Sequence, residues 1–168
     1  HVSMLPVLKI RNLAKSYAGA AGRPVLRGVS LDVAPGEYVA VMGESGVGKS
    51  TLLNLIAGLD TPDAGSIELD GTDFTALDDT ARTLLRRRSM GFVFQAFHLL
   101  PHLSVSQNVA LPLALNGFAQ QETDVRVQHL LDAVGLTERG SSRPRELSGG
   151  EQQRVAVARA LAHRPRLL

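Results

Sequence analysis

The feature that most constrains the fold of this chain is a glycine-rich run at residues 43–51, which reads G-E-S-G-V-G-K-S-T. It matches the pattern G-x-x-x-x-G-K-[ST], in which glycines allow backbone N–H groups to turn inward around phosphate oxygens. In that pattern Lys49 reaches the outer phosphates, and the hydroxyl of Ser50 can ligate Mg²⁺. The run therefore predicts a phosphate-binding loop; the alternative is an ordinary glycine-rich turn between two core elements.

The segments on either side of this loop have the composition that such a loop needs. Residues 38–42 are short and mostly apolar, as in a buried strand. After the loop, apolar residues recur at helical spacing, and Gly58 is placed to end the helix. These apolar positions are Leu52, Leu53, Leu55, Ile56 and Leu59. A strand, a glycine loop and a helix form the setting in which phosphate binds at a helix N-terminus.

Composition places the chain among ordinary globular proteins. The 168 residues are 44% hydrophobic and 20% charged, which suits one domain with one sizeable core. The absence of cysteine excludes disulfides and thiolate metal sites. No apolar run approaches the roughly 20 residues that span a bilayer, and no signal peptide is visible. Because the chain begins with His1 rather than Met, we expect residues 1–3 not to be native to it.

The charge balance argues against a nucleic-acid-binding domain. The formal net charge is only +2, and the densest basic run is Arg86, Arg87 and Arg88. A nucleic-acid interface usually presents a broader basic face. We interpret these arginines as the solvated end of a helix, where the helix dipole favours cations.

Apolar and polar residues alternate in the first half of the chain, which predicts strands at residues 8–11, 29–33 and 66–70. Residues 78–88 have acidic residues in the first turn and arginines in the last, which predicts a helix. A short apolar run at residues 91–94 predicts a further buried strand that ends at Gln95.

The pattern becomes helical after residue 96. Ser104 and Gln107 have the spacing of a capping box, which opens a helix through about Leu115, and Pro112 is expected to disturb that helix. A second helix is expected over residues 120–134, where Gly135 follows it. Residues 139–145 form a polar loop.

A second glycine motif, L-S-G-G-E at residues 147–151, precedes another helical pattern. Ser148 is a natural N-cap, while Gly149 and Gly150 leave the start of the helix open for close approach. The expected apolar face of this helix contains Val155, Ala158 and Leu161. The motif predicts a second helix N-terminus suited to an anion, and an ordinary capped amphipathic helix is the alternative.

The phosphate loop, Gln95 after a strand and the L-S-G-G-E motif together resemble the nucleotide-binding domain of ATP-binding cassette (ABC) transporters. The resemblance covers about residues 6–168. The stretch at residues 91–103, followed by N-V-A-L-P-L at residues 108–113, is similar to the subgroup that serves lipoprotein release and macrolide or peptide export. It implies an α/β fold: a P-loop NTPase core of ABC type with N-terminal antiparallel β elements and an inserted helical subdomain.

The resemblance implies a single nucleotide-binding domain over residues 1–168, whose parts do not include the whole family pattern. A β-rich and phosphate-loop core would cover residues 6–95, a helical subdomain residues 96–146, and the signature helix with the start of the next strand residues 147–168. The family continues with a strand, called Walker B, that ends in Asp-Glu, and later with a switch histidine. We therefore expect the C-terminal part of the core to be missing. The histidines that do not match the switch position are His98, His102, His129 and His163.

The resemblance also implies a site for ATP and Mg²⁺. Tyr17 would stack on adenine, and a surface tyrosine at a strand end is the alternative. Gln95 would contact Mg²⁺ and the attacking water, and Ser50 would ligate the same ion. The signature residues Ser148, Gly149 and Gly150 would contact the γ-phosphate of ATP held by a second copy. The residues expected to hold ATP within one copy are Tyr17, Gly43, Ser45, Gly46, Gly48, Lys49, Ser50 and Thr51.

The implied function is that of an ATP-hydrolysing subunit of an export transporter, which powers a separate integral membrane permease by ATP-driven head-to-tail homodimerisation. Such a subunit lies in the cytoplasm, peripheral on the inner (plasma) membrane. Residues 97–103 would contact the permease, or else belong to the core of the helical subdomain. Two other functions stay open: a nucleotide-binding fragment without turnover, and a soluble ABC-type ATPase acting on nucleic acid. The lack of sustained heptads and of zinc-binding cysteines argues against the latter.

Overall fold

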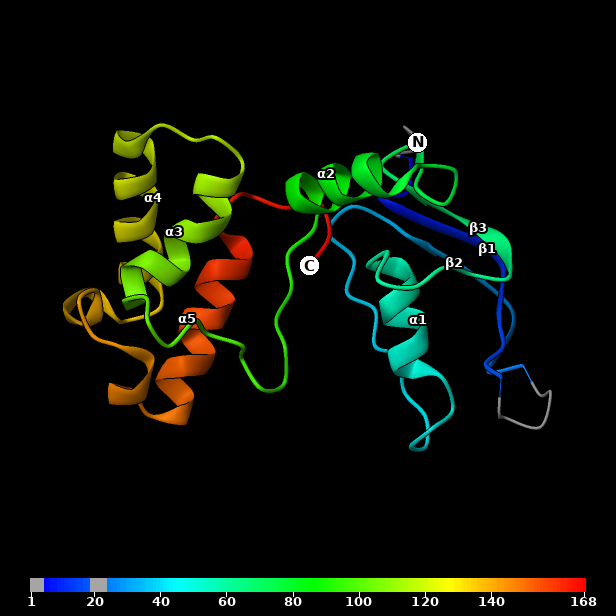
Figure 1. The fold of residues 1–168 in the computed structure, drawn as a ribbon, viewed down its shortest axis with the longest axis horizontal. Helices are drawn as coiled ribbons and strands as arrows, with labels where there is room; N and C mark the ends of the chain where they lie inside the picture. The colour runs from blue at the N-terminus through cyan, green and yellow to red at the C-terminus, as the bar shows by residue number, and fades with distance from the viewer. Residues whose placement is uncertain (1–4, 19–23) are drawn as a thin grey trace. The chain divides into compact units, whose positions relative to one another are not determined.

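The structure, a computed structural model, describes residues 5–18 and 24–168. Residues 1–3, which we expect not to be native, lie outside these ranges. The chain divides into two units, His1–Arg86 and Arg87–Leu168. Each unit has its own secondary structure (Figure 1). The boundaries expected at residues 95 and 146 stay predictions.

The first unit is built on an antiparallel sheet with the strand order β2-β1-β3-β4. Its strands are β1 Leu8–Lys15, β2 Leu26–Val33, β3 Ala64–Leu69 and β4 Thr72–Asp73. Ile10 lies opposite Leu31 of β2 and Ile67 of β3, so apolar side chains of neighbouring strands share a face. These strands confirm the predictions for residues 8–11, 29–33 and 66–70.

Helix α1 (Lys49–Ile56) follows the phosphate loop, as predicted. Leu52 and Leu55 are buried, whereas Leu53 and Leu59 are exposed. The apolar face is therefore narrower than predicted, because Leu53 is rotated about 100° from Leu52 around the helix and Leu59 lies beyond its end. Gly58 follows the helix with a φ of 66°, a left-handed conformation typical of a helix C-terminus.

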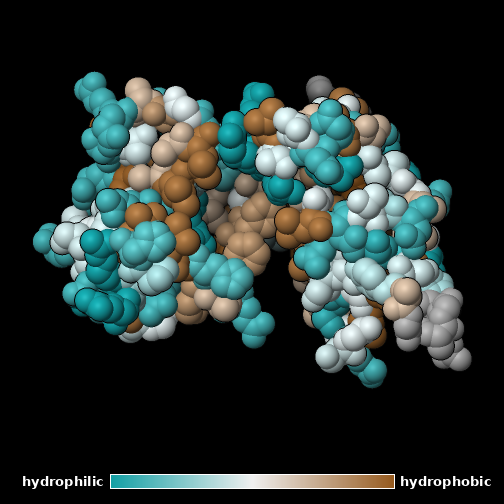
Figure 2. All heavy atoms as spheres, in the orientation of Figure 1, coloured by the Kyte–Doolittle hydropathy of each residue, from teal (hydrophilic) through white to brown (hydrophobic). Residues whose placement is uncertain are grey.

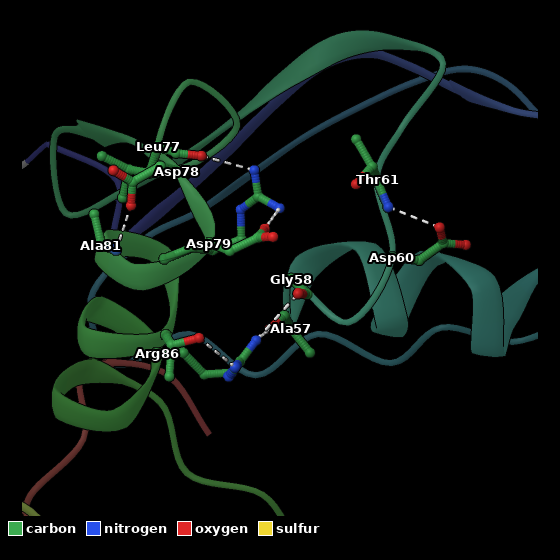
Figure 3. Close-up of polar contacts among 11 residues, drawn as sticks. Ala57, Gly58, Asp60, Thr61, Leu77, Asp78, Asp79, Ala81 and Arg86 are labelled. Atoms are coloured by element: carbon green, nitrogen blue, oxygen red, sulfur yellow. Dashed lines mark hydrogen bonds and ion pairs between the residues drawn. The ribbon is translucent and has the colours of Figure 1, made fainter.

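Helix α2 (Asp79–Ser89) confirms the helix predicted at residues 78–88. The guanidinium of Arg86 donates hydrogen bonds to the carbonyls of Ala57 (3.2 Å) and Gly58 (3.0 Å), as Figure 3 shows. Arg86 thus satisfies carbonyls at the C-terminal end of α1. Our interpretation of this arginine as a solvated side chain is wrong, because its charge is used to fix one helix to another.

Two predicted strands do not form. Residues 38–42 and 91–94 have no strand assignment, and Tyr38 is 100% exposed. Beside the second segment lies only an isolated parallel bridge between Met90 and Leu167. A strand needs backbone hydrogen bonds to a neighbour, and neither segment lies beside a strand within residues 5–18 and 24–168. Both predictions are therefore wrong for this structure. Figure 2 shows hydrophobic residues, coloured brown, on the surface of each unit.

The second unit is helical. Its helices are α3 Val105–Leu115, α4 Gln120–Ala133 and α5 Gly149–Leu161, with short 3-10 helices at η1 Thr137–Arg139 and η2 Pro144–Glu146. Helix α3 packs against both α4 and α5. The fully buried side chains between them include Val105, Val109, Leu113 and Val155.

The ends of these helices follow the sequence pattern closely. The capping box of Ser104 and Gln107 forms, and Gly135 follows α4 with a φ of 70°. Pro112 lies inside α3, which continues to Leu115, and the expected disturbance of the helix stays a prediction. The side-chain amide of Asn116 donates to the Pro112 carbonyl (2.8 Å) and caps the last turn of the helix.

Candidate functional site

The phosphate loop has a backbone conformation at Gly48, directly before α1, that favours glycine. Gly48 is the N-cap of α1 and has a φ of 105°, in the left-handed region. A Cβ atom there would lie 2.9 Å from Cγ1 and 3.1 Å from the carbonyl oxygen of Val25. Gly48 is thus required by its own conformation and by the chain that leads into β2.

Positive charge is held inside this loop. The Lys49 ammonium donates hydrogen bonds to the carbonyls of Gly43 and Glu44, both at 2.6 Å. No side chain caps the N-terminus of α1, so its first N–H groups are not occupied by a capping residue. An ammonium beside an uncapped helix N-terminus suits the phosphates of a nucleotide.

The other loop residues are accessible to a ligand. Ser45, Gly46 and Ser50 are exposed, while Thr51 in the first turn of α1 is half-buried. In the described part of the chain, no group of three or more His, Asp or Glu side chains could hold a metal ion. Magnesium would therefore depend on phosphate oxygens and one or two protein ligands such as Ser50, which is its usual mode of binding in nucleotide sites.

Tyr17 lies in a polar cluster that the sequence did not indicate. Its hydroxyl donates to Asp60 (2.6 Å), and the residue remains 42% exposed. The Lys15 ammonium also donates to Asp60 (2.9 Å). Mainly through the bond from Tyr17, and then that from Lys15, the pKa of Asp60 falls to about 2. The carboxylate bond also raises the pKa of the Tyr17 phenol.

In the second unit, Gln95 is exposed in a turn in which the N–H of Phe97 donates to the carbonyl of Phe94 (3.0 Å). Phe97 and His98 both have left-handed backbones, with φ of 60° and 49°. Arg159 of α5 donates to both of their carbonyls at 2.7 Å. This strained turn after Gln95 is therefore held by the helix that begins at the L-S-G-G-E motif.

The rest of this loop is anchored by Asn108. Its buried side chain accepts from the N–H of Leu100 (2.8 Å) and donates to the carbonyls of Leu100 (3.1 Å) and Leu103 (3.3 Å). Leu99 packs against the helical core, whereas Pro101 and His102 are exposed. Residues 97–103 therefore combine a fixed backbone with an accessible tip.

Ser148 caps α5 as predicted. Its hydroxyl accepts from the N–H of Glu151 (3.3 Å), and the Glu151 carboxylate accepts from the N–H of Ser148 (2.8 Å). The pKa of Glu151 is lowered mainly by the hydrogen bond from the Ser148 backbone, then by the Ser148 hydroxyl and by nearby Arg139. Gly149 and Gly150 are exposed, and a Cβ on either would meet nothing within 4 Å.

The predicted site residues fall into two groups. Tyr17 and the phosphate loop belong to the first unit, while Gln95 and the signature residues Ser148, Gly149 and Gly150 belong to the second. Of the expected apolar face of α5, Val155 and Ala158 are buried, but Leu161 is 36% exposed at the helix end.

Comparisons with known proteins agree with these motifs. The family model described as "ABC transporter" matches residues 26–168. The lipoprotein-releasing system ATP-binding protein LolD 2 of Caulobacter vibrioides is 51% identical over 164 residues, which are 97% of this chain and 72% of that protein. The LolD protein of Pseudomonas syringae pv. tomato is 52% identical over 163 residues, or 96% of this chain and 72% of that protein.

Solved structures give the same result. A dimeric ATP-binding cassette in a post-hydrolysis state, bound to ADP and Pi, matches with a TM-score of 0.83 and 40% identity, over 94% of this chain and 70% of that chain. A dimeric bacterial ABC transporter cassette matches with a TM-score of 0.84 and 41% identity, with the same coverage. These likenesses confirm the predicted α/β fold of ABC type. The chain therefore belongs to the ABC transporter family, as an ATP-binding subunit of ATPase type.

Proposed function

We propose that residues 43–51 hold the phosphates of ATP and that this binding powers an export transporter. The observation that carries the proposal is the Lys49 ammonium, held 2.6 Å from the Gly43 and Glu44 carbonyls beside an uncapped helix N-terminus. Such a site binds anions through backbone N–H groups and one cation. ATP, when bound, supplies a γ-phosphate that can be transferred to water.

The metal in this proposal is Mg²⁺, with Ser50 and Gln95 as its protein contacts. Ser50 is exposed in the first turn of α1, and Gln95 is exposed in the turn after residues 91–94. A hydroxyl and an amide oxygen are suitable ligands for this hard cation. Their role is to orient the phosphates and a water molecule.

Ser148, Gly149 and Gly150 are proposed to contact the γ-phosphate of ATP held by a second copy in a head-to-tail homodimer. The support is that the chain itself does not require glycine at positions 149 and 150: an added Cβ atom would meet nothing within 4 Å, and neither residue has a left-handed φ. Two solved cassettes of similar fold are dimers, and one of them is bound to ADP and Pi. Charge stabilisation would thus come from across an interface.

The partner is proposed to be an integral membrane permease of a lipoprotein-releasing type, because the relatives in Caulobacter and Pseudomonas carry that name. The chain would lie on the cytoplasmic face of the inner membrane. Among the described residues, no helix is long and apolar enough to cross a membrane. Residues 97–103, with their anchored backbone and exposed Pro101 and His102, are the proposed contact with the permease.

The test of the central proposal is ATP binding by Lys49→Ala, measured by calorimetry. Loss of a charge-assisted hydrogen bond costs about 1.5–3 kcal/mol, so affinity should fall roughly 10- to 100-fold. Lys9→Ala is the matched control, because Lys9 is a half-exposed lysine on β1 whose partner is Glu68. Equal ATP affinity of the two variants and the parent chain would refute the assignment of the phosphate loop.

A further inference from the structure

Tyr17 is an exposed aromatic residue that is nevertheless fixed at its hydroxyl. The phenol donates to Oδ2 of Asp60 (2.6 Å), while Oδ1 of Asp60 accepts from the Lys15 ammonium (2.9 Å) and from the N–H of Thr61 (2.7 Å). Figure 3 shows Asp60 in the segment that follows α1, with its carboxylate accepting from the N–H of Thr61. Both oxygens of this carboxylate are thus committed to defined partners.

Lys15 restrains the same ring in a second way. Its ammonium lies over the ring of Tyr17, 5.1 Å from the centroid, and also donates to the carbonyl of Thr61 (2.7 Å). This places a cation on one face of the aromatic system. A planar ligand that stacks on Tyr17 would therefore use the opposite face.

The backbone around Tyr17 is tied to the same segment. The N–H of Ser16 donates to the Asp63 carboxylate (2.7 Å), and the N–H of Asp63 donates to the carbonyl of Ala14 (2.9 Å). Asp60 and Asp63 thus fix both the side chain and the main chain at the end of β1.

We propose that Asp60, together with Lys15, is a positioning residue that orients Tyr17 as a one-sided platform for the nucleobase of the bound nucleotide. The inference rests on the proposed function of the phosphate loop and on the stacking role that the family resemblance implies for Tyr17; what it adds is the pair of residues that hold the ring. A freely rotating exposed tyrosine loses side-chain freedom when a base stacks on it. A ring already held at its hydroxyl and on one face loses less, so binding is stronger.

The test compares ATP with inorganic triphosphate, which carries the phosphates without a base. Asp60→Asn keeps the size of the side chain but removes its charge. We expect ATP affinity to fall about 3- to 10-fold, while triphosphate affinity changes by less than about twofold. Equal weakening of both ligands, or no weakening of either, would overturn the proposal.

Two further variants distinguish failure of this proposal from failure of the phosphate-loop proposal. Lys49→Ala should weaken ATP and triphosphate alike; if it weakens neither, the phosphate-loop proposal fails rather than the role of Asp60. Glu68→Gln is the matched control, since Glu68 is a carboxylate on β3 whose lysine partner is Lys9. It should leave both affinities unchanged.

A spectroscopic measurement tests the contact without any nucleotide. The chain has two tyrosines and no tryptophan, so Tyr38→Phe leaves Tyr17 as the single reporter. In that background, the absorbance of tyrosinate should appear at lower pH when Asp60→Asn is added, because the carboxylate no longer favours the protonated phenol. An unchanged titration would overturn the proposed contact.

The last measurement is the ATP affinity of the double variant that combines Tyr17→Phe with Asp60→Asn. Tyr17→Phe keeps the ring and loses the hydroxyl bond, so it should weaken ATP as Asp60→Asn does. If both act through this bond, the double variant loses no more ATP affinity than the weaker-binding single variant. Losses that add fully would mean independent roles and would overturn the proposal.

Discussion

The N-termini of α1 and α5 both contain glycine, but the glycines have different surroundings at these two helix starts. At α1, Gly48 has a left-handed backbone and lies against Val25, and no side chain caps the helix. At α5, Ser148 and Glu151 form a complete capping box, while Gly149 has open space around it. Both ends share the partial positive charge of a helix N-terminus.

This difference in surroundings shows which glycines are required by the internal geometry of the chain. Gly48 is required by internal geometry, because the loop must turn sharply and pass close to the residue before β2. Gly149 and Gly150 have no such requirement, because a Cβ atom on either would meet nothing within 4 Å. The first start fits our proposal of a ligand held within one copy, and the second fits our proposal of a contact made across an interface.

The largest expected effect comes from adding one methyl group at each start. Gly48→Ala should lower the free energy of unfolding by about 2–4 kcal/mol, from left-handed strain and the contact with Val25. Gly149→Ala should raise it by up to about 1 kcal/mol, because alanine favours helix and meets no neighbour. Urea denaturation followed by circular dichroism measures both. Similar losses in the two variants would break the comparison.

A smaller effect is expected at the cap of α5. Ser148→Ala should lower the local stability of α5 by about 1 kcal/mol, measured by amide hydrogen exchange, and leave ATP affinity of the separate chain unchanged. Loss of ATP affinity in this variant would show that Ser148 acts within its own copy.

Mixing variants tests whether the two starts meet across an interface. A copy with Lys49→Ala and a copy with Ser148→Ala can together form one intact composite site in a head-to-tail dimer. With ATP present, sedimentation should show more dimer in the mixture than in either variant alone. A mixture that dimerises no better than its components would contradict the proposed arrangement.

The smallest effect is the pH dependence of the cap. The folded state lowers the pKa of Glu151 below its ordinary value of about 4.3, so its stabilisation is full above that pH and is lost as pH falls through the lowered pKa. The stability advantage of the parent chain over Glu151→Gln should therefore narrow below about pH 4.3, as judged by urea midpoints. An advantage that stays constant down to acid pH would exclude this carboxylate as its source.

Local sequence predicted well wherever the required interactions are also local. The capping boxes at Ser104 and Ser148 involve residues three positions apart, and both form. Gly58 and Gly135 end their helices with left-handed backbones. Strands β1, β2 and β3 of the antiparallel sheet are likewise recovered, since their alternation reflects one buried face, whereas the two-residue β4 was not predicted.

Local sequence failed where an element depends on a distant partner. Residues 38–42 have the composition of a strand, yet Tyr38 is fully exposed because no neighbouring strand supplies hydrogen bonds in the described chain. In the same way, nothing near Tyr17 in the sequence points to Asp60. Arg159 could not be linked to the turn at Phe97 and His98 by any motif either.

The sequence by itself determined the chemistry of the two helix starts, since loop glycines, a lysine and a capping serine act over a few neighbouring residues. Tertiary structure alone decided which of those glycines are required internally, and which side chains hold Tyr17 and the loop after Gln95. The reason is physical: close contacts and hydrogen bonds depend on distance in space, and distance along the chain predicts it only within a turn or a helix.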